Sequence, residues 1–249
     1  MVSTDLKYSQ YLQILREELI PAMGCTEPIA MAYAAAKARE MLGSVPERID
    51  IVISGNIIKN VKSVHIPGTG GQVGIETAIA MGAILGDSTR KLMVIADADT
   101  TRMPEVEAYA ASGSIAVHLQ KDCPKLYIRI EARPGDVVVE ISDYHTRVTR
   151  FEREGRNLLS AADAASCAEH RIVEEYTDRS FLTIDLICDK ARTMPLDPVE
   201  GLFDEVVRCN EAIAREGLSG LWGIAIGRTI QEGIRDGVYG DDIKNNLAS

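Results

Sequence analysis

Four short segments with the composition of β-strands follow one another between two longer stretches with helical patterns. Each segment is rich in β-branched residues and alternates apolar with polar positions, and turn-forming residues such as Pro134-Gly135 separate them. Such a run favours an antiparallel sheet with one solvated face. We therefore expect an α+β protein, in which a helical bundle formed by the N- and C-terminal segments carries an inserted antiparallel β-sheet region. The four predicted strands are 115–120, 126–132, 137–143 and 147–154.

The remaining sequence is mainly helical in pattern. Apolar residues recur every three or four positions in the predicted helices, whereas two short apolar runs are typical of strands. The pattern divides the chain into 1–90, a helical segment with a cysteine turn and a glycine loop; 91–160, the α+β sheet region; and 161–249, a helical segment packing back on the first. The helices are expected at 4–20, 27–42, 75–85, 104–111, 161–176, 182–191, 198–216 and 221–235, and the two additional strands at 49–54 and 91–96.

The charge and composition exclude several classes of function. The chain has 249 residues, 46% of them hydrophobic, which is enough to bury a substantial core. Its net charge of −10, without a run of basic residues, argues against binding of nucleic acid. It contains no apolar run of about 18 residues and no signal peptide, so we expect no contact with the membrane and a cytoplasmic location.

Cys25 is the residue with the strongest chemical signature. Pro28 fits only the first turn of a helix and Thr26 can cap free backbone amides, so the helix is expected to begin at Thr26 or Glu27. The thiol would then lie at a helix N-terminus, where the helix dipole favours the thiolate that binds metals or attacks electrophiles. The alternative is an inert buried cysteine, the ordinary state of such residues. The polar neighbours Thr26 and Glu27 make a buried site less suitable.

Two further segments have the composition of a ligand site. The first, residues 55–60, interrupts a strand pattern with polar side chains. The second, residues 67–74, is a glycine-rich loop that opens a helix and can expose backbone amides to a phosphate or carboxylate. It matches neither the Walker loop nor the dinucleotide fingerprint. The alternative is a tight turn with close helix packing at Gly82 and Gly86.

The other cysteines give no metal-binding motif. The five cysteines are far apart and form no Cys-x-x-Cys pair, which argues against a disulfide scaffold or a zinc ribbon. Cys167, Cys188 and Cys209 lie in helical patterns and are expected to be buried, and Trp222 is expected to pack against other side chains. His65, beside the glycine loop, is the histidine best placed for chemistry, although a structural role is the alternative.

Four blocks of sequence together resemble the N-terminal part of the iron-sulfur L-cysteine desulfidase family, which is related to the alpha chain of bacterial iron-sulfur L-serine dehydratases. The resemblance covers essentially the whole chain and depends on the order and spacing of the blocks. The blocks are Gly24-Cys25-Thr26-Glu27-Pro28; Ser54-x-Asn56-x-x-Lys59-Asn60-Val61; Ile66-Pro67-Gly68-Thr69-Gly70; and Asn210-x-Ala212-Ile213-x-x-Glu216-Gly217-Leu218.

The resemblance implies a lyase of amino-acid catabolism that removes sulfide from L-cysteine, or water from L-serine, to give pyruvate and ammonia. In that family a [4Fe-4S] cluster held by three cysteines leaves one iron open to act on the substrate. By this analogy Cys25 is a cluster ligand, and Lys59 and His65 are candidates for the base that removes the α-proton. The implied substrate-binding residues are Thr26, Glu27, Asn56, Asn60, Gly68, Thr69 and Gly70.

One feature of the family is missing from the sequence. Its other two cluster cysteines lie in a C-terminal region for which no matching motif exists before Ser249. We therefore expect that this chain is truncated or one part of a split enzyme, holds no cluster alone, and forms a homodimer or binds a C-terminal partner region. The alternative function is a non-catalytic domain that binds a small anionic molecule. A cysteine nucleophile is a third reading and would require a histidine within hydrogen-bond reach of Cys25.

Overall fold

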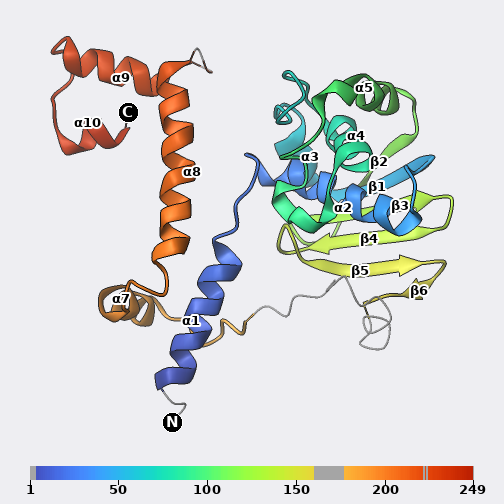
Figure 1. Cartoon of the computed structure of the whole chain (residues 1–249), viewed down its shortest axis with the longest axis horizontal. Helices are drawn as coiled ribbons and strands as arrows, with labels where there is room; N and C mark the ends of the chain where they lie inside the picture. Colours follow the sequence, from blue (N-terminus) through green and yellow to red (C-terminus); the bar gives the residue numbers. More distant parts are fainter. Residues whose placement is uncertain (1–3, 160–176, 221, 223, 249) are drawn as a thin grey trace. The chain divides into compact units, whose positions relative to one another are not determined.

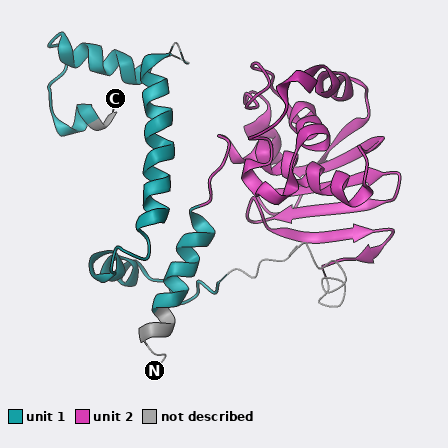
Figure 2. Cartoon of the chain, viewed as in Figure 1, with its two compact units in different colours: residues 1–19, 177–249 teal, residues 20–176 magenta. Residues whose placement is uncertain are grey.

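The computed structural model of the chain describes residues 4–159, 177–220, 222 and 224–248 (Figure 1). It confirms the α+β class, because helices are combined with a six-stranded sheet. The chain divides into two compact units (Figure 2), which we call the helical unit, Met1–Leu19 with Thr177–Ser249, and the sheet unit, Ile20–Tyr176. The predicted boundaries at 90 and 160 differ from this division, since residues 20–90 supply a strand and helices to the sheet unit.

The sheet is mixed, with the strand order β2-β1-β3-β4-β5-β6. All the strand pairs are antiparallel except β1 with β2, which run parallel. The antiparallel sheet predicted after residue 90 is thus joined by the strand at residues 48–54, which lies between β2 and β3 and runs parallel to β2. Parallel neighbours need a long crossover connection, and helices between residues 55 and 111 provide it. The strands are β1 (Arg48–Ser54), β2 (Ile115–Gln120), β3 (Tyr127–Arg133), β4 (Val137–Ser142), β5 (Val148–Arg153) and β6 (Arg156–Asn157).

Alternation along the strands produces one buried face and one polar face. In β3, for example, Ile128, Ile130 and Ala132 are buried, whereas the intervening residues are half-buried and polar. The polar face carries pairs such as Arg129 with Glu131 (2.6 Å), so the predicted solvated face is confirmed. The buried face is covered by helix α2 (Thr26–Leu42), which contacts β3 and β4.

Helices α2 and α4 (Ile75–Leu85) pack closely against each other above the sheet (Figure 1). Alanine occupies most of the inner positions of α2, and every residue from Pro28 to Ala38 is buried. α5 (Met103–Ala111) packs in turn against α4. Helix α2 ends at Gly43, whose positive φ of 77° gives the left-handed C-cap that glycine adopts most easily.

Two predicted segments have a different local structure. The predicted strand at 91–96 is instead part of a 3₁₀ helix, η1 (Ser88–Met93), followed by turns, and a second 3₁₀ helix, η2 (Thr100–Arg102), precedes α5. Leu92, Val94 and Ile95 are buried as expected of an apolar run, but a short run does not distinguish a strand from other buried structure. Residues 55–60, which interrupt the strand pattern with polar side chains, belong to helix α3 (Gly55–Val61), in which Ile57 and Val61 are buried.

The helical unit is built from both ends of the chain. Helix α1 (Thr4–Glu18) contacts the segment after residue 176: Glu17 accepts hydrogen bonds from the amide (3.1 Å) and hydroxyl (2.7 Å) of Thr177. The ring of Tyr11 packs edge-on against Phe181, with ring centroids 5.5 Å apart. The other helices are α7 (Ile184–Thr193), α8 (Glu200–Ser219), α9 (Ile226–Arg235) and α10 (Ile243–Ala248).

Several side chains predicted to be buried in this unit are exposed. Cys188 in α7, Cys209 in α8 and Trp222 between α8 and α9 all lie at the surface, and α7, α8 and α9 contain no buried residue. The predicted helix 161–176, with Cys167, lies outside the described residues. Among the described residues, every helix is too short or too polar to span a lipid bilayer.

Candidate functional site

Cys25 lies at the N-terminus of α2, as predicted. It occupies the N-cap position with an extended backbone (φ −60°, ψ 123°), and α2 begins at Thr26. The residue is exposed, and its Sγ makes no hydrogen bond with any residue in the described ranges. The expectation that Thr26 caps the helix is wrong, because Cys25 holds that position. The thiol therefore remains accessible beside the free amides of the first turn of α2.

The glycine loop lies next to this turn. A methyl group placed on Gly24 would lie 3.9 Å from Cγ of Pro67, which is ordinary van der Waals contact. Gly24 has a φ of +88°, a conformation that favours glycine, so the backbone before Cys25 can approach the loop without steric hindrance. Cys25 and the loop from Pro67 to Gly71 are consequently neighbours in space, although more than forty residues separate them in the sequence.

The glycine loop is closed by its own hydrogen bonds. His65 forms a β-bridge with Val73, and the amide of Ile66 donates to the carbonyl of Gln72 (2.9 Å). The Thr69 hydroxyl donates to the carbonyl of Ile66 (2.7 Å) and accepts from the amide of Gln72 (3.0 Å). Thr69 is also buried, so in this structure its hydroxyl stabilises the loop.

The two glycines on either side of Thr69 are the accessible part of the loop. Gly68 and Gly70 are exposed and have φ angles of +77° and +69°. Backbone amides in such a turn can bind an anion. His65 is exposed at the base of the loop, and its ring lies beside Gly71, since Nδ1 would be 3.9 Å from a methyl group there. The predicted loop residues therefore lie together at the surface.

Helix α3 brings the polar residues 56–60 to the same turn. The Ser54 hydroxyl accepts from the amide of Ile57 (3.3 Å) and donates to the carbonyl of Lys125 (2.6 Å), which fixes the start of α3. Asn56, Lys59 and Asn60 are spaced by three and four residues and hence share one helix face.

The link between α3 and α2 is a direct hydrogen bond. The amide group of Asn60 donates to Oε1 of Glu27 over 3.0 Å. Asn56 and Lys59 are exposed on the same helix. The structure thus brings together the first turn of α2, α3 and the glycine loop, which are the first three of the four sequence blocks. The fourth block lies in α8 of the helical unit.

His145 is a site residue that the sequence reasoning missed. It lies in the loop between β4 and β5, and its Nε2 is 2.9 Å from the hydroxyl of Thr26. Burial lowers the pKa of His145, while the negative charge of Glu27 acts in the opposite direction. Burial therefore favours the neutral form of the imidazole, which is hydrogen-bonded to Thr26, the residue after Cys25. No local motif reveals this contact, because 119 residues separate the two partners.

The pH dependence of stability tests the position of His145. Its folded pKa lies below the unfolded value of about 6.5, so the unfolded chain gains the proton first as the pH falls. The contribution of His145 to the free energy of unfolding is therefore fully present above about pH 6.5 and is lost as the pH falls below this value. We expect His145→Gln to remove this decrease and to cost about 1 kcal/mol at higher pH through loss of the Thr26 hydrogen bond. Urea denaturation across this pH range measures both effects.

The matched control for this experiment is Thr26→Val, which removes the hydrogen-bond partner of His145 and keeps the imidazole. Because burial is the main cause of the lowered pKa of His145, this variant should keep the decrease in stability at low pH. A His145→Gln variant with the same slope as the parent protein would contradict the lowered pKa of the half-buried His145.

The described residues contain no group of three His, Cys, Asp or Glu side chains that could hold a metal ion. Cys123 lies in the loop between β2 and β3, where its thiol donates to the carbonyl of Gln120 (3.5 Å). Cys188 and Cys209 belong to the helical unit. Within the part of the chain that the structure describes, Cys25 is thus a single exposed thiol in a polar setting formed by α2, α3 and the glycine loop.

The fold and site define an α+β protein of two units with an exposed cysteine at a helix N-terminus. The chain is similar to a UPF0597 protein of Fusobacterium nucleatum, with 44% identity over 247 residues, 98% of this chain and 57% of the relative. It is also similar to UPF0597 proteins of Desulfitobacterium hafniense (39% over 246 residues, 98% and 55%) and Lachnoclostridium phytofermentans (35% over 239 residues, 95% and 55%).

The chain therefore spans little more than half the length of these curated relatives. The names of the relatives specify no reaction, ligand or partner. No family model matches the chain. No solved structure matches it either.

Proposed function

We propose that this chain belongs to an iron-sulfur-dependent lyase that converts L-cysteine, or L-serine, to pyruvate and ammonia, and that Cys25 is one of its cluster ligands. The observation that carries the proposal is the meeting of three sequence blocks at one place: Gly24 lies against Pro67, and Glu27 binds Asn60. These three blocks are among the four that resemble the iron-sulfur L-cysteine desulfidase family. The proposal includes a cytoplasmic location for the protein.

The described residues of the sheet unit do not fit a complete [4Fe-4S] site. Such a cluster is held by several cysteine thiolates, whereas the sheet unit offers only Cys25 at this position within its described residues. The exposure of Cys25 and its place at a helix N-terminus suit a thiolate donor. We infer that the other donors come from outside the described residues of the sheet unit.

The groups around Cys25 are suited to an amino-acid substrate. An α-carboxylate is recognised by cations and exposed amides, which Lys59 and the loop glycines Gly68 and Gly70 supply. An α-ammonium group is recognised by carboxylate and amide oxygens, which Glu27 and Asn60 supply. The two kinds of group lie on neighbouring elements, so they can orient a small zwitterion.

A base must remove the α-proton in this reaction. Loss of the proton and of sulfide or water yields an enamine, whose imine tautomer is hydrolysed to pyruvate and ammonia. Lys59 and His65 are the candidates from the sequence, and His145 is a third. We favour His145, because it is hydrogen-bonded to Thr26 beside Cys25 and burial favours the neutral imidazole, which can accept a proton.

The test is anaerobic reconstitution with ferrous iron and sulfide. The protein is assayed alone and together with the polypeptide that the Fusobacterium nucleatum relative carries outside the 247 matched residues. We expect a broad visible absorbance and formation of pyruvate from L-cysteine or L-serine with the two together. Cys25→Ala should reduce bound iron and activity by more than about 100-fold, beyond the loss expected for a residue that only supports a ligand.

The matched control is Cys123→Ala, which removes another thiol of the sheet unit and should keep both signals. Iron and activity that survive Cys25→Ala would contradict the proposal. Binding of an amino acid or another small anion without iron would instead favour the non-catalytic function, for which the exposed turn at Gly68 and Gly70 is the supporting observation.

A further inference from the structure

The helical unit exposes an extensive apolar surface. Most of the large exposed apolar side chains in the described residues lie between 184 and 243. Ile184 is 77% exposed, Ile224 is 83% exposed and Trp222 is 61% exposed. Single exposed apolar residues are normal, whereas a contiguous group of them marks an interaction surface.

The helices of this unit have the pattern of helices that pack against a partner. In α9, the residues Ile226, Ile230 and Ile234 follow one another at intervals of four and form an apolar stripe. In α8, Phe203 and Val207 are also four residues apart and lie on one face of the helix, and their side chains are 44% and 54% exposed. Helices with such a stripe derive most of their stability from burying it, yet no residue of α7, α8 or α9 is buried.

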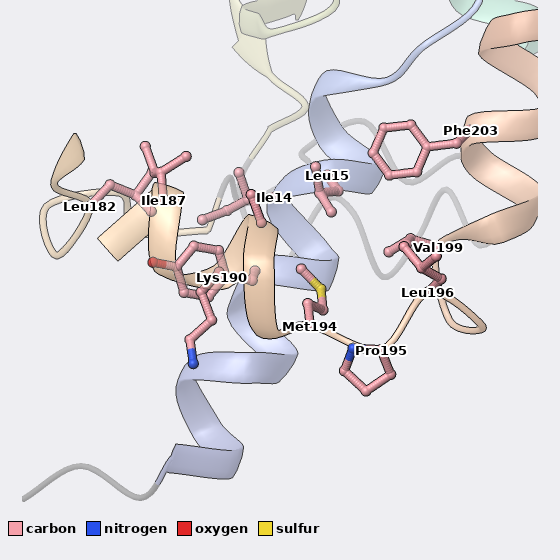
Figure 3. A pocket seen from close by; sticks show the side chains of 12 residues that line it. Ile14, Leu15, Leu182, Ile187, Lys190, Met194, Pro195, Leu196, Val199 and Phe203 are labelled. Carbon is pink, nitrogen blue, oxygen red and sulfur yellow. The ribbon is translucent and has the colours of Figure 1, made fainter. Parts of the chain in front are cut away.

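A groove of about 400 Å³ continues this surface between α1, α7 and α8 (Figure 3). Its walls are almost entirely apolar and include Ile14, Ile187, Met194 and Phe203. A second, open hollow of about 350 Å³ lies where α8 meets α9, and Trp222 lines it. The apolar surface therefore extends over several helices, which is more than a small ligand would cover.

Tyr11 gives the groove a specific polar requirement. Its side chain lines the groove and is only 6% exposed, and its hydroxyl has no hydrogen-bond partner in the described residues. Leaving a buried hydroxyl unpaired costs about 1 to 3 kcal/mol, so native structures usually supply a partner. A polypeptide that fills the groove can supply one through a backbone carbonyl.

We propose that this surface docks the polypeptide that the longer relatives carry in addition to the matched region. The matched 247 residues make up 57% of the Fusobacterium nucleatum relative, so the rest of that protein, more than a third of its length, lies outside the match. A segment of this size can cover α7, α8 and α9 together with the groove. The inference concerns docking only, and it stands whether or not the complex binds iron.

The experiment mixes this chain with that segment of the Fusobacterium nucleatum relative, produced as a separate polypeptide. Trp222 is the single tryptophan of the chain, so 5-fluorotryptophan incorporated here gives one ¹⁹F resonance. We expect a one-to-one complex by light scattering and a shift of this resonance on addition of the unlabelled segment. Phe203→Asp with Ile230→Asp should weaken binding by more than about 30-fold, the loss expected at the centre of an interface.

The matched control is Arg208→Asp, which also introduces a negative charge on α8, at an exposed residue outside the stripe of Phe203 and Val207. It should bind like the parent chain, and circular dichroism verifies that all variants retain their helices. Two results would overturn the proposal: a homodimer of this chain that Phe203→Asp dissociates, which would assign the surface to a second copy, or no complex and no change in the ¹⁹F resonance.

Discussion

Replacing Gly82 by alanine is expected to destabilise the sheet unit by about 3 kcal/mol or more, at the upper end of the cost of overpacking. A Cβ atom at this position would lie 2.0 Å from the carbonyl oxygen of Ala32 and 2.6 Å from its Cα. These atoms belong to the backbone of α2, so a rotamer change cannot relieve the overlap. The two helices must separate, and the packing of α2 against α4 is lost along their length. Urea denaturation followed by circular dichroism measures the cost.

Two further variants define the cause of this effect. Gly55→Ala also adds a methyl group to a helix, but its nearest neighbour is Cδ1 of Leu119 at 3.6 Å, so this variant should be as stable as the parent or more stable. Gly82→Ala combined with Ala32→Gly should remain destabilised, because the overlap involves backbone atoms of residue 32. Recovery of stability in the double variant, or a cost below about 0.5 kcal/mol for Gly82→Ala, would show that the helices do not approach so closely.

The sequence predicted the elements of this packing better than their arrangement. Helices α2 and α4 were expected from their composition, and close packing at Gly82 and Gly86 was one of the two interpretations of the glycine-rich segment. The structure confirms close packing, since a methyl group at Gly86 would lie 2.9 Å from Cβ of Ala36. The other interpretation, an anion site at the loop, stays a prediction.

Contacts between distant segments were beyond a reading of the sequence alone. Strands β1 and β2 pair in parallel, although about sixty residues separate them in the sequence. The alternation of residues within a strand predicts its buried face but does not specify which strand lies beside it. For the same reason the contact between Thr26 and His145 had no local signal. Helix α3 is not predicted from the sequence, because most residues of this short segment are polar. The four-residue spacing of Ile57 and Val61, which are both buried, is the helical signal in this segment.

The surface of the helical unit was also misjudged from the sequence. Apolar residues at helical spacing were interpreted as buried, which is the usual outcome for amphipathic helices. Cys209 and Trp222 are exposed. An apolar stripe is buried only where another element packs against it, and the spacing of the apolar residues does not identify that element. The amphipathic pattern thus predicted the helices correctly and their environment incorrectly.

Truncation of Ile130 to alanine is expected to destabilise the sheet unit by about 2 to 5 kcal/mol, through lost burial and the cavity that remains. Ile130 is completely buried in β3, between Ile51 of β1 and Val139 of β4. Helix α2 packs on the same strands, so a cavity here removes support from the helix that begins at Cys25. Denaturation by urea, with the slope compared between variants, measures the change in stability.

The graded control is Ile130→Val, which removes one methylene group and should cost only about 0.5 to 1.5 kcal/mol. Ile130→Leu keeps the volume and should cost less than about 1.5 kcal/mol. A cost below about 1 kcal/mol for Ile130→Ala, or equal costs for the alanine and valine variants, would be inconsistent with a tightly packed interface between the sheet and α2. The expected gradation would show instead that the position of the Cys25 turn depends on the packing of the sheet beneath it.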